Sequence, residues 1–322
     1  MNVYPIKFRP ILKEKIWGGN KLNVLLGKDT DKSNFGESWE ISDVNRNISE
    51  VINGEYKGHN LKELIEMHGA DFLGTENFKN FGSNFPLLIK FLDAKTDLSV
   101  QVHPDNIMAK KYHNSFGKTE MWYIMDSDAN ADIVLGLKDE KINPEILNHI
   151  NSQNVDKIFN RQPAKKGDSF FIPSGKIHAI GAGVLAAEIQ QTSDITYRVY
   201  DWDRTDDSGQ KRELHTQLAT EATKQIDSSS KINYTLQPNK IATLVDCDYF
   251  TTNILDIQTQ YSNDYSSLDS FVIFMCVEGE VKVTAGFHTE TLKMGETILL
   301  PATTQGVILH AENGKLLEIF LS

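Results

Sequence analysis

The sequence predicts an all-β dominated fold of two barrels with short helical segments attached. Short apolar runs, alternating or continuous and separated by turn residues, fill most of the chain and are typical of strands. A strand that feeds a tight turn is marked by Gly167, five further residues and Pro173, and the same spacing returns at Gly295 and Pro301. A spacing that recurs in this way indicates two copies of one structural unit.

Composition narrows the class of protein. The chain has 322 residues, 40% hydrophobic and 24% charged, as in ordinary globular proteins. Its net charge of −11 argues against nucleic acid and anionic membranes as partners, because both require a basic surface. No apolar run has the length of a membrane helix, so we expect a cytoplasmic protein. Cys247 and Cys276 lack metal-site spacing and are expected to be reduced core thiols.

Residues 85–106, FPLLIKFLDAKTDLSVQVHPDN, contain the first candidate ligands. The first half is a continuous apolar run that fits a buried strand, whereas the second half alternates. Val100 and Val102 fall on one face, and Gln101 and His103 fall on the other. Alternation alone favours polar side chains that face water. The alternative is that this face lines a cavity and that both side chains reach one metal ion.

Two more candidate ligands follow. Glu120 is followed by a bulky apolar run, so its strand enters the core, where an unpaired carboxylate costs several kcal/mol. Pro173 ends strand pairing, Gly175 allows the turn, and the next strand points His178 inward. Together with Gln101 and His103 these residues could bind zinc, although iron or manganese accepts the same ligands.

The remaining segments predict the domain organisation. Residues 225–240 show neither helical nor strand periodicity and are the best linker candidate. A boundary within them divides the chain into a catalytic metal-binding domain, 1–235, and a C-terminal barrel, 236–322. No Gly or His follows Pro301 at the positions of Gly175 and His178, so the second barrel is expected to be degenerate and to bind no metal. Short helices are expected at residues 61–67 with Asn60 as the cap, 105–113, 143–160 and 213–226.

The spacing from Gly167 to His178 resembles the second motif of the cupins, which are jelly-roll barrels. The chain as a whole resembles the type I mannose-6-phosphate isomerases, in their short bacterial form. The matching segments cover most of residues 10–204 and are WGGNKL, GESWEIS, PLLIKFLDAKTDLSVQVHPDN, GKTEMWYIM, IPSGKIHAIG and EIQQTSDITYRVYDWDR. The resemblance implies an aldose–ketose isomerase with a hexose phosphate substrate and one zinc ion per chain.

The resemblance also implies the site residues. The four zinc ligands would be Gln101, His103, Glu120 and His178. Arg198 falls on the active-site arginine of the family, and three other active-site positions fall on Lys118, Glu188 and Asp194. The chain departs from the pattern at Ile180, where longer members have Tyr, and at Gly117, where many relatives have His. No mechanism that depends on either of those side chains applies to this chain.

The roles of the other site residues stay open at this level. The general base could be Asp194, Glu188 or Lys118, and Arg198 could contact an anion or form a structural salt bridge with Asp201 or Asp203. Lys118 could be a solvated surface lysine, and Asp194 a turn cap. Two other functions compete, namely another metal-dependent cupin enzyme such as an oxygenase, and a sugar-binding or regulatory protein without catalysis. The sequence carries no signature of an oligomeric interface.

Overall fold

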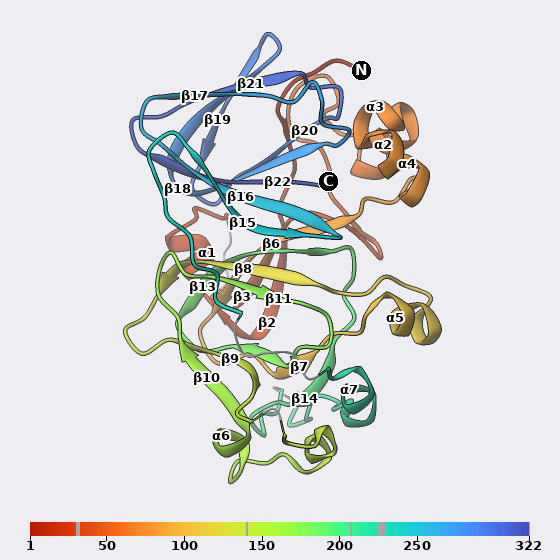
Figure 1. Ribbon diagram of the computed structural model, residues 1–322, viewed down its shortest axis with the longest axis vertical. Helices are drawn as coiled ribbons and strands as arrows, with labels where there is room; N and C mark the ends of the chain where they lie inside the picture. Colours follow the sequence, from red (N-terminus) through yellow and green to blue (C-terminus); the bar gives the residue numbers. More distant parts are fainter. Residues whose placement is uncertain (30–32, 140, 207, 225–229, 322) are drawn as a thin grey trace.

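A computed structural model describes residues 1–29, 33–139, 141–206, 208–224 and 230–321. Two barrels are stacked along the long axis of the molecule, and both chain ends lie beside the C-terminal barrel (Figure 1). Strands dominate both barrels, and the helices are short and peripheral. The predicted all-β fold of two barrels with helical attachments is therefore confirmed.

The central sheet lies between the two barrel interiors. Its strands run in the order β11-β8-β13-β6-β2-β3. In chain order they are β2 (Ile11–Gly19), β3 (Phe35–Ile41), β6 (Leu87–Ala94), β8 (Glu120–Ser127), β11 (Ser169–Ile172) and β13 (Val184–Gln191). Alternate residues point to opposite faces, so Ile89 and Phe91 pack toward the C-terminal barrel while Lys90 and Leu92 point into the first barrel. Both faces are buried, which explains the continuous apolar run of β6.

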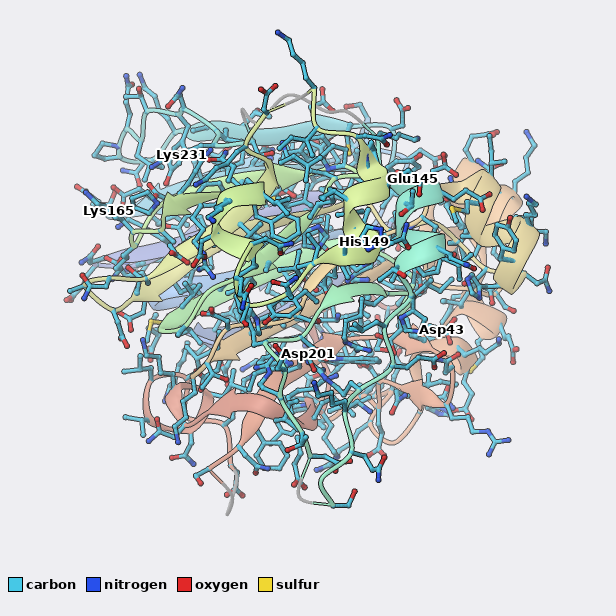
Figure 2. The ribbon with its side chains drawn as sticks, turned by 90° about the horizontal axis from the view of Figure 1, so that it is seen from below. Asp43, Glu145, His149, Lys165, Asp201 and Lys231 are labelled. Atoms are coloured by element: carbon cyan, nitrogen blue, oxygen red, sulfur yellow. The ribbon has the colours of Figure 1, made fainter. Side chains whose placement is uncertain are left out.

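The outer sheet closes the first barrel, with the strand order β10-β9-β12-β7-β14. In chain order its strands are β7 (Val100–Val102), β9 (Asp132–Leu137), β10 (Phe159–Pro163), β12 (His178–Ile180) and β14 (Tyr197–Tyr200). Its outer face is covered by the 3-10 turn η1 (Pro144–His149), α6 (Val155–Ile158) and α7 (Thr216–Ala222). Glu145 and His149 mark η1 at the front of Figure 2. Because this face is apolar and covered, the polar residues of the same strands point into the barrel.

The C-terminal sheet forms the second barrel and also takes in the first strand of the chain. In chain order its strands are β1 (Ile6–Lys7), β15 (Ile241–Cys247), β16 (Phe250–Ile257), β17 (Gln260–Asp264), β18 (Val272–Ala285), β19 (His288–Lys293), β20 (Thr297–Leu300), β21 (Gly306–His310) and β22 (Gly314–Phe320). Ile6 of β1 lies opposite Leu299 of β20, so the N-terminal segment pairs within the C-terminal barrel. The domain boundary after residue 235 stays a prediction.

The remaining elements lie at the edges of the barrels. A small hairpin pairs β4 (Asp43–Val44) with β5 (Asn47–Ile48). The other helices are α1 (Lys21–Val24), α2 (Leu61–His68), α3 (Ala70–Leu73), α4 (Thr75–Phe81) and α5 (Asn106–His113). Asn60 caps α2 through Glu63, and Asp105 caps α5 through Met108. No helix in the described ranges is long and apolar enough to span a membrane.

Several local predictions are confirmed and a few are wrong in detail. The repeated turn is confirmed, because Gly167 and Gly295 have nearly identical left-handed φ angles of 88° and 87°. Both cysteines are free, with Cys276 buried and Cys247 half-buried. Only residues 216–222 of the helix expected at 213–226 form α7 within the described part of the chain. Residues 225–229 of the expected linker lie outside the described residues, and Ser230 and Ile232 hydrogen-bond to the edge of β11.

Candidate metal centre and the adjoining cavity

Strand register places two rows of side chains on the interior faces of the first barrel. Neighbouring positions on the outer sheet, from β12 through β7 to β14, are His178, Gln101 and Arg198. Neighbouring positions on the central sheet, from β3 through β6 and β13 to β8, are Trp39, Lys90, Glu188 and Trp122. The barrel interior lies between these rows. The prediction that the polar face of residues 99–103 is exposed to water is wrong, since Ser99 and His103 are buried and Gln101 is half-buried.

Two imidazoles meet in this interior with their Nε2 atoms 3.1 Å apart. The Nδ1–H of His103 donates to the carbonyl of Ile195, and the Nδ1–H of His178 donates to the carbonyl of Lys176. Burial lowers the pKa of both rings, that of His178 to about 3, so both are neutral. With Nδ1 protonated, each Nε2 presents a lone pair to the other. Two lone pairs that converge in this way suit a cation bound between them.

Glu120 completes a buried cluster with the two histidines. Its Oε1 is 3.3 Å from His178 Nε2 and its Oε2 is 3.5 Å from His103 Nε2. Neither oxygen accepts a well-formed hydrogen bond from the residues that the structure describes. Burial raises the pKa of Glu120 to about 7, because the ionised carboxylate loses its hydration. A divalent cation would offset this loss. Ligand atoms around tetrahedral zinc lie roughly 3.3–3.5 Å apart, so this cluster fits such an ion.

Gln101 and Lys118 flank the cluster. The side-chain nitrogen Nε2 of Gln101 is 3.3 Å from His178 Nε2, which places the amide group beside the cluster. Lys118 is 5% exposed, and its Nζ is 3.1 Å from His103 Nε2 and 3.0 Å from Glu120 Oε2. The interpretation of Lys118 as a solvated surface lysine is therefore wrong. Its ammonium instead contacts two of the candidate ligand atoms.

A cavity of about 280 Å³ opens beside this cluster. Every residue that the resemblance assigns to catalysis lines it, namely Lys118, Glu188, Asp194 and Arg198, and so does Gln101. His103, Glu120 and His178 lie behind this lining as the buried cluster. The structure thus brings all eight predicted site residues together around one space.

Lys90 and Glu37 also line this cavity, although sequence reasoning missed both. Lys90 is 3% exposed, and its Nζ is 3.1 Å from Glu188 Oε1. Trp122 Nε1 donates to the other Glu188 oxygen at 3.0 Å. Burial opposes charge on Glu188, but Lys90 and Lys118 outweigh it and lower the pKa of that carboxyl group. The signal in the sequence was a single lysine inside the apolar run of β6.

Arg198 does not form the structural salt bridge with Asp201 or Asp203 that was the alternative to an anion contact. Asp201 instead pairs with Arg204 and Arg212, and Asp203 pairs with Lys211. Arg198 Nη1 donates to the carbonyl of Glu213 at 2.8 Å. Its Nε is buried and has no hydrogen-bond partner in the described chain. The guanidinium therefore retains donors for an anion in the cavity.

Asp194 is the exposed member of the site. It makes no hydrogen bond or ion pair with any residue in the described ranges, so the alternative of a turn cap is wrong. Glu188, in contrast, has both oxygens engaged by Lys90 and Trp122. Asp194 is therefore the less constrained of these two carboxylates.

Comparisons with known proteins agree with this arrangement. The family model described as phosphomannose isomerase type I, catalytic domain, matches residues 6–139, and the model described as mannose-6-phosphate isomerase, cupin domain, matches residues 240–320. The mannose-6-phosphate isomerase of Streptococcus mutans is 37% identical over 93% of both chains, and that of Bacillus subtilis named ManA is 38% identical over 94% of both. The crystal structure of the mannose 6-phosphate isomerase from Bacillus subtilis superposes with a TM-score of 0.86 at 36% identity, covering 98% of this chain and 99% of that chain.

Proposed function

The chain belongs to the phosphomannose isomerase type I family, and from this premise we propose that it interconverts mannose 6-phosphate and fructose 6-phosphate at a bound zinc ion. The proposed ligands are His103, Glu120, His178 and Gln101. One observation carries the zinc site: two neutral imidazoles direct their Nε2 lone pairs at each other, 3.1 Å apart, beside a carboxylate whose Oε1 accepts no hydrogen bond in the described chain. Neutral imidazole and carboxylate are ligands that zinc accepts.

The reaction moves a proton between C1 and C2 of the open-chain sugar through an enediolate. When bound, zinc supplies Lewis acidity, an effect worth several kcal/mol in metal-assisted reactions. We assign the proton transfer to Asp194, because its carboxylate lines the cavity and is engaged by no described neighbour. Glu188 is held as an ion by Lys90 and Trp122, which makes it a fixed negative charge and not a mobile base.

Two cations act on the anionic parts of the substrate. Arg198 presents unused guanidinium donors to the cavity and contacts the phosphate or an enediolate oxygen. Lys118 places its ammonium beside the metal cluster and donates a hydrogen bond to a sugar oxygen there. Toward the ketose, Asp194 takes the proton from C2 and returns it to C1 while the O2 hydroxyl proton passes to O1, so the protein is left unchanged after each turnover.

The test is isomerisation of mannose 6-phosphate by the full-length protein before and after chelation, with the metal content measured in each sample. We expect activity to disappear with the metal and to return with one equivalent of zinc. Iron and manganese are added in parallel to separate samples. Return of activity with iron alone would reject zinc, and oxygen uptake without isomerisation would favour the oxygenase alternative. A zinc-loaded protein that neither isomerises the sugar nor consumes oxygen would leave the non-catalytic alternative.

The cellular setting is part of the same proposal. Free Cys247 and Cys276 support a reducing compartment, and we propose the cytoplasm. The proposed partner is the hexose phosphate itself, which suits the excess of cationic groups in the cavity of a chain whose net charge is −11.

A further inference from the structure

A second, larger cavity lies next to the cavity that adjoins the metal cluster. The cavity at the cluster is called the catalytic cavity. Its volume is about 440 Å³, within the range of roughly 300–1,000 Å³ of small-ligand pockets. It is formed by the β4–β5 hairpin, the chain after α5 and the loop of residues 192–195. Asp43 of this hairpin is labelled in Figure 2. Asp194 lines both cavities, so the two spaces share one wall.

The two cavities differ in charge. The catalytic cavity is lined by lysines and arginines, namely Lys15, Lys90, Lys118, Arg198 and Arg212. In the described chain, no lysine or arginine lines the second cavity, whereas two carboxylates, Asp43 and Asp194, do. A phosphate or carboxylate ligand needs cationic donors and would be repelled there. The second cavity therefore suits a neutral ligand.

The polar groups of the second cavity have unused hydrogen-bonding capacity. The side chains of Asn45, Ser115 and Thr192 make no hydrogen bond with the residues that the structure describes. Amides and hydroxyls of this kind both donate and accept hydrogen bonds, as sugar hydroxyls do. Phe116 adds an aromatic ring, which is tilted against Phe81 with the ring centres 5.9 Å apart. An apolar ring beside amides, hydroxyls and carboxylates matches the alternation of C–H and O–H groups on a pyranose.

We propose that this second cavity is a binding site for a neutral, unphosphorylated hexopyranose, occupied independently of the hexose phosphate in the catalytic cavity. Asn45 holds the ligand hydroxyls and Phe116 packs against the sugar ring. Asn45 adopts a left-handed backbone with φ of 56°, a conformation that asparagine accepts more readily than most residues.

The experiment uses methyl α-D-mannopyranoside, a neutral sugar whose ring cannot open, with the full-length zinc-loaded protein. Binding is followed by saturation-transfer NMR and titrated to obtain Kd. We expect binding to persist in the presence of a saturating mannose 6-phosphate and fructose 6-phosphate mixture, because the phosphates occupy the other cavity. Displacement of the neutral sugar by that mixture would overturn the proposal, since the sugar would then occupy the catalytic cavity.

Variants locate the site. Asn45→Gly keeps the left-handed backbone and removes the amide, and we expect it to weaken binding about tenfold, as does Phe116→Ala. Asn239→Gly is the matched control, because Asn239 also has a left-handed φ, of 54°, but lies on the other barrel. Arg198→Ala should bind the neutral sugar as the wild type does. Wild-type affinity in folded Asn45→Gly and Phe116→Ala, or no binding by the wild type, would reject the site, and neither result depends on turnover.

Discussion

The two barrels bury carboxylates in opposite ways. In the first barrel, Glu120 lies between two histidines and its oxygens accept no well-formed hydrogen bond from the described chain. In the second barrel, Glu318 is 1% exposed and each oxygen has a neutral donor: Tyr265 and Asn263 contact one, and Asn253 donates to the other at 2.8 Å.

This difference distinguishes a candidate metal site in the first barrel from a structural hydrogen-bond cluster in the second. Both barrels use the same strand and turn, with left-handed glycines at Gly167 and Gly295. In the second barrel the protein itself satisfies the buried carboxylate, so the carboxylate is part of the packing. In the first barrel Glu120 Oε1 has no donor in the described chain, Oε2 is contacted by the Lys118 ammonium, and two imidazole lone pairs converge beside them, so the cluster suits a bound ion. The chemistry of the barrel thus follows from which polar groups are left unpaired.

The largest expected effect is that of His178→Ala in the first barrel. Removal of one imidazole leaves only three of the four proposed ligands, so metal content and turnover should both be lost. Metal analysis and the isomerase assay measure the two losses. A folded variant that still holds one metal ion per chain would contradict the assignment of His178 as a ligand in the first barrel.

The next effect is that of Arg198→Ala, which should keep the metal and lower kcat/KM roughly 100- to 1,000-fold, as expected for loss of a donor to a developing anion. The reason is that Arg198 lines the cavity and makes no ion pair with the described residues. Arg198→Lys, which keeps the charge without the planar fork, should recover part of the activity. Unchanged kinetics for Arg198→Ala would return this side chain to a structural role.

A smaller effect is expected for Glu37→Gln on the central sheet. Burial opposes the charge of Glu37, but Lys90, Lys15 and the Trp39 indole outweigh it and lower the pKa of Glu37 from 4.5 to about 2. This stabilisation is present above pH 4.5 and is lost as the pH falls toward 2. The variant should lose about 1.5–3 kcal/mol of unfolding free energy at neutral pH. Denaturant titrations should show the difference from wild type shrinking at low pH, and a constant difference would contradict this assignment.

The smallest effect is expected for Tyr265→Phe in the second barrel. The change removes one donor from Glu318 and should lower the unfolding free energy by about 1–3 kcal/mol. Metal content and kcat/KM should stay at wild-type values, because the cluster lies in the other barrel. Chemical denaturation, metal analysis and the isomerase assay together test this, and a fall in metal content would show that the two clusters are coupled.

Much of the fold followed from local patterns, and the proposed ligand set followed from such patterns together with the family resemblance. Alternation in β7 separates Gln101 from Val100 and Val102, and the turn before His178 has a recognisable spacing. Lys90 and Glu37 were missed because their environment depends on which strands are neighbours, and register across a sheet is set by tertiary packing. Leu98, two residues before Val100, does not share the face of Val100 and Val102, because it precedes β7 and packs into the barrel interior.

The pairing of β1 with β20 has a consequence for how the chain is made. Ile6 is synthesised long before its partner Leu299. The first strand therefore waits until β20 has been made, and contacts so distant in sequence form slowly. A chain shortened before β20 would leave β1 without its partner, so β1 can join its sheet only after the C-terminal barrel has been synthesised.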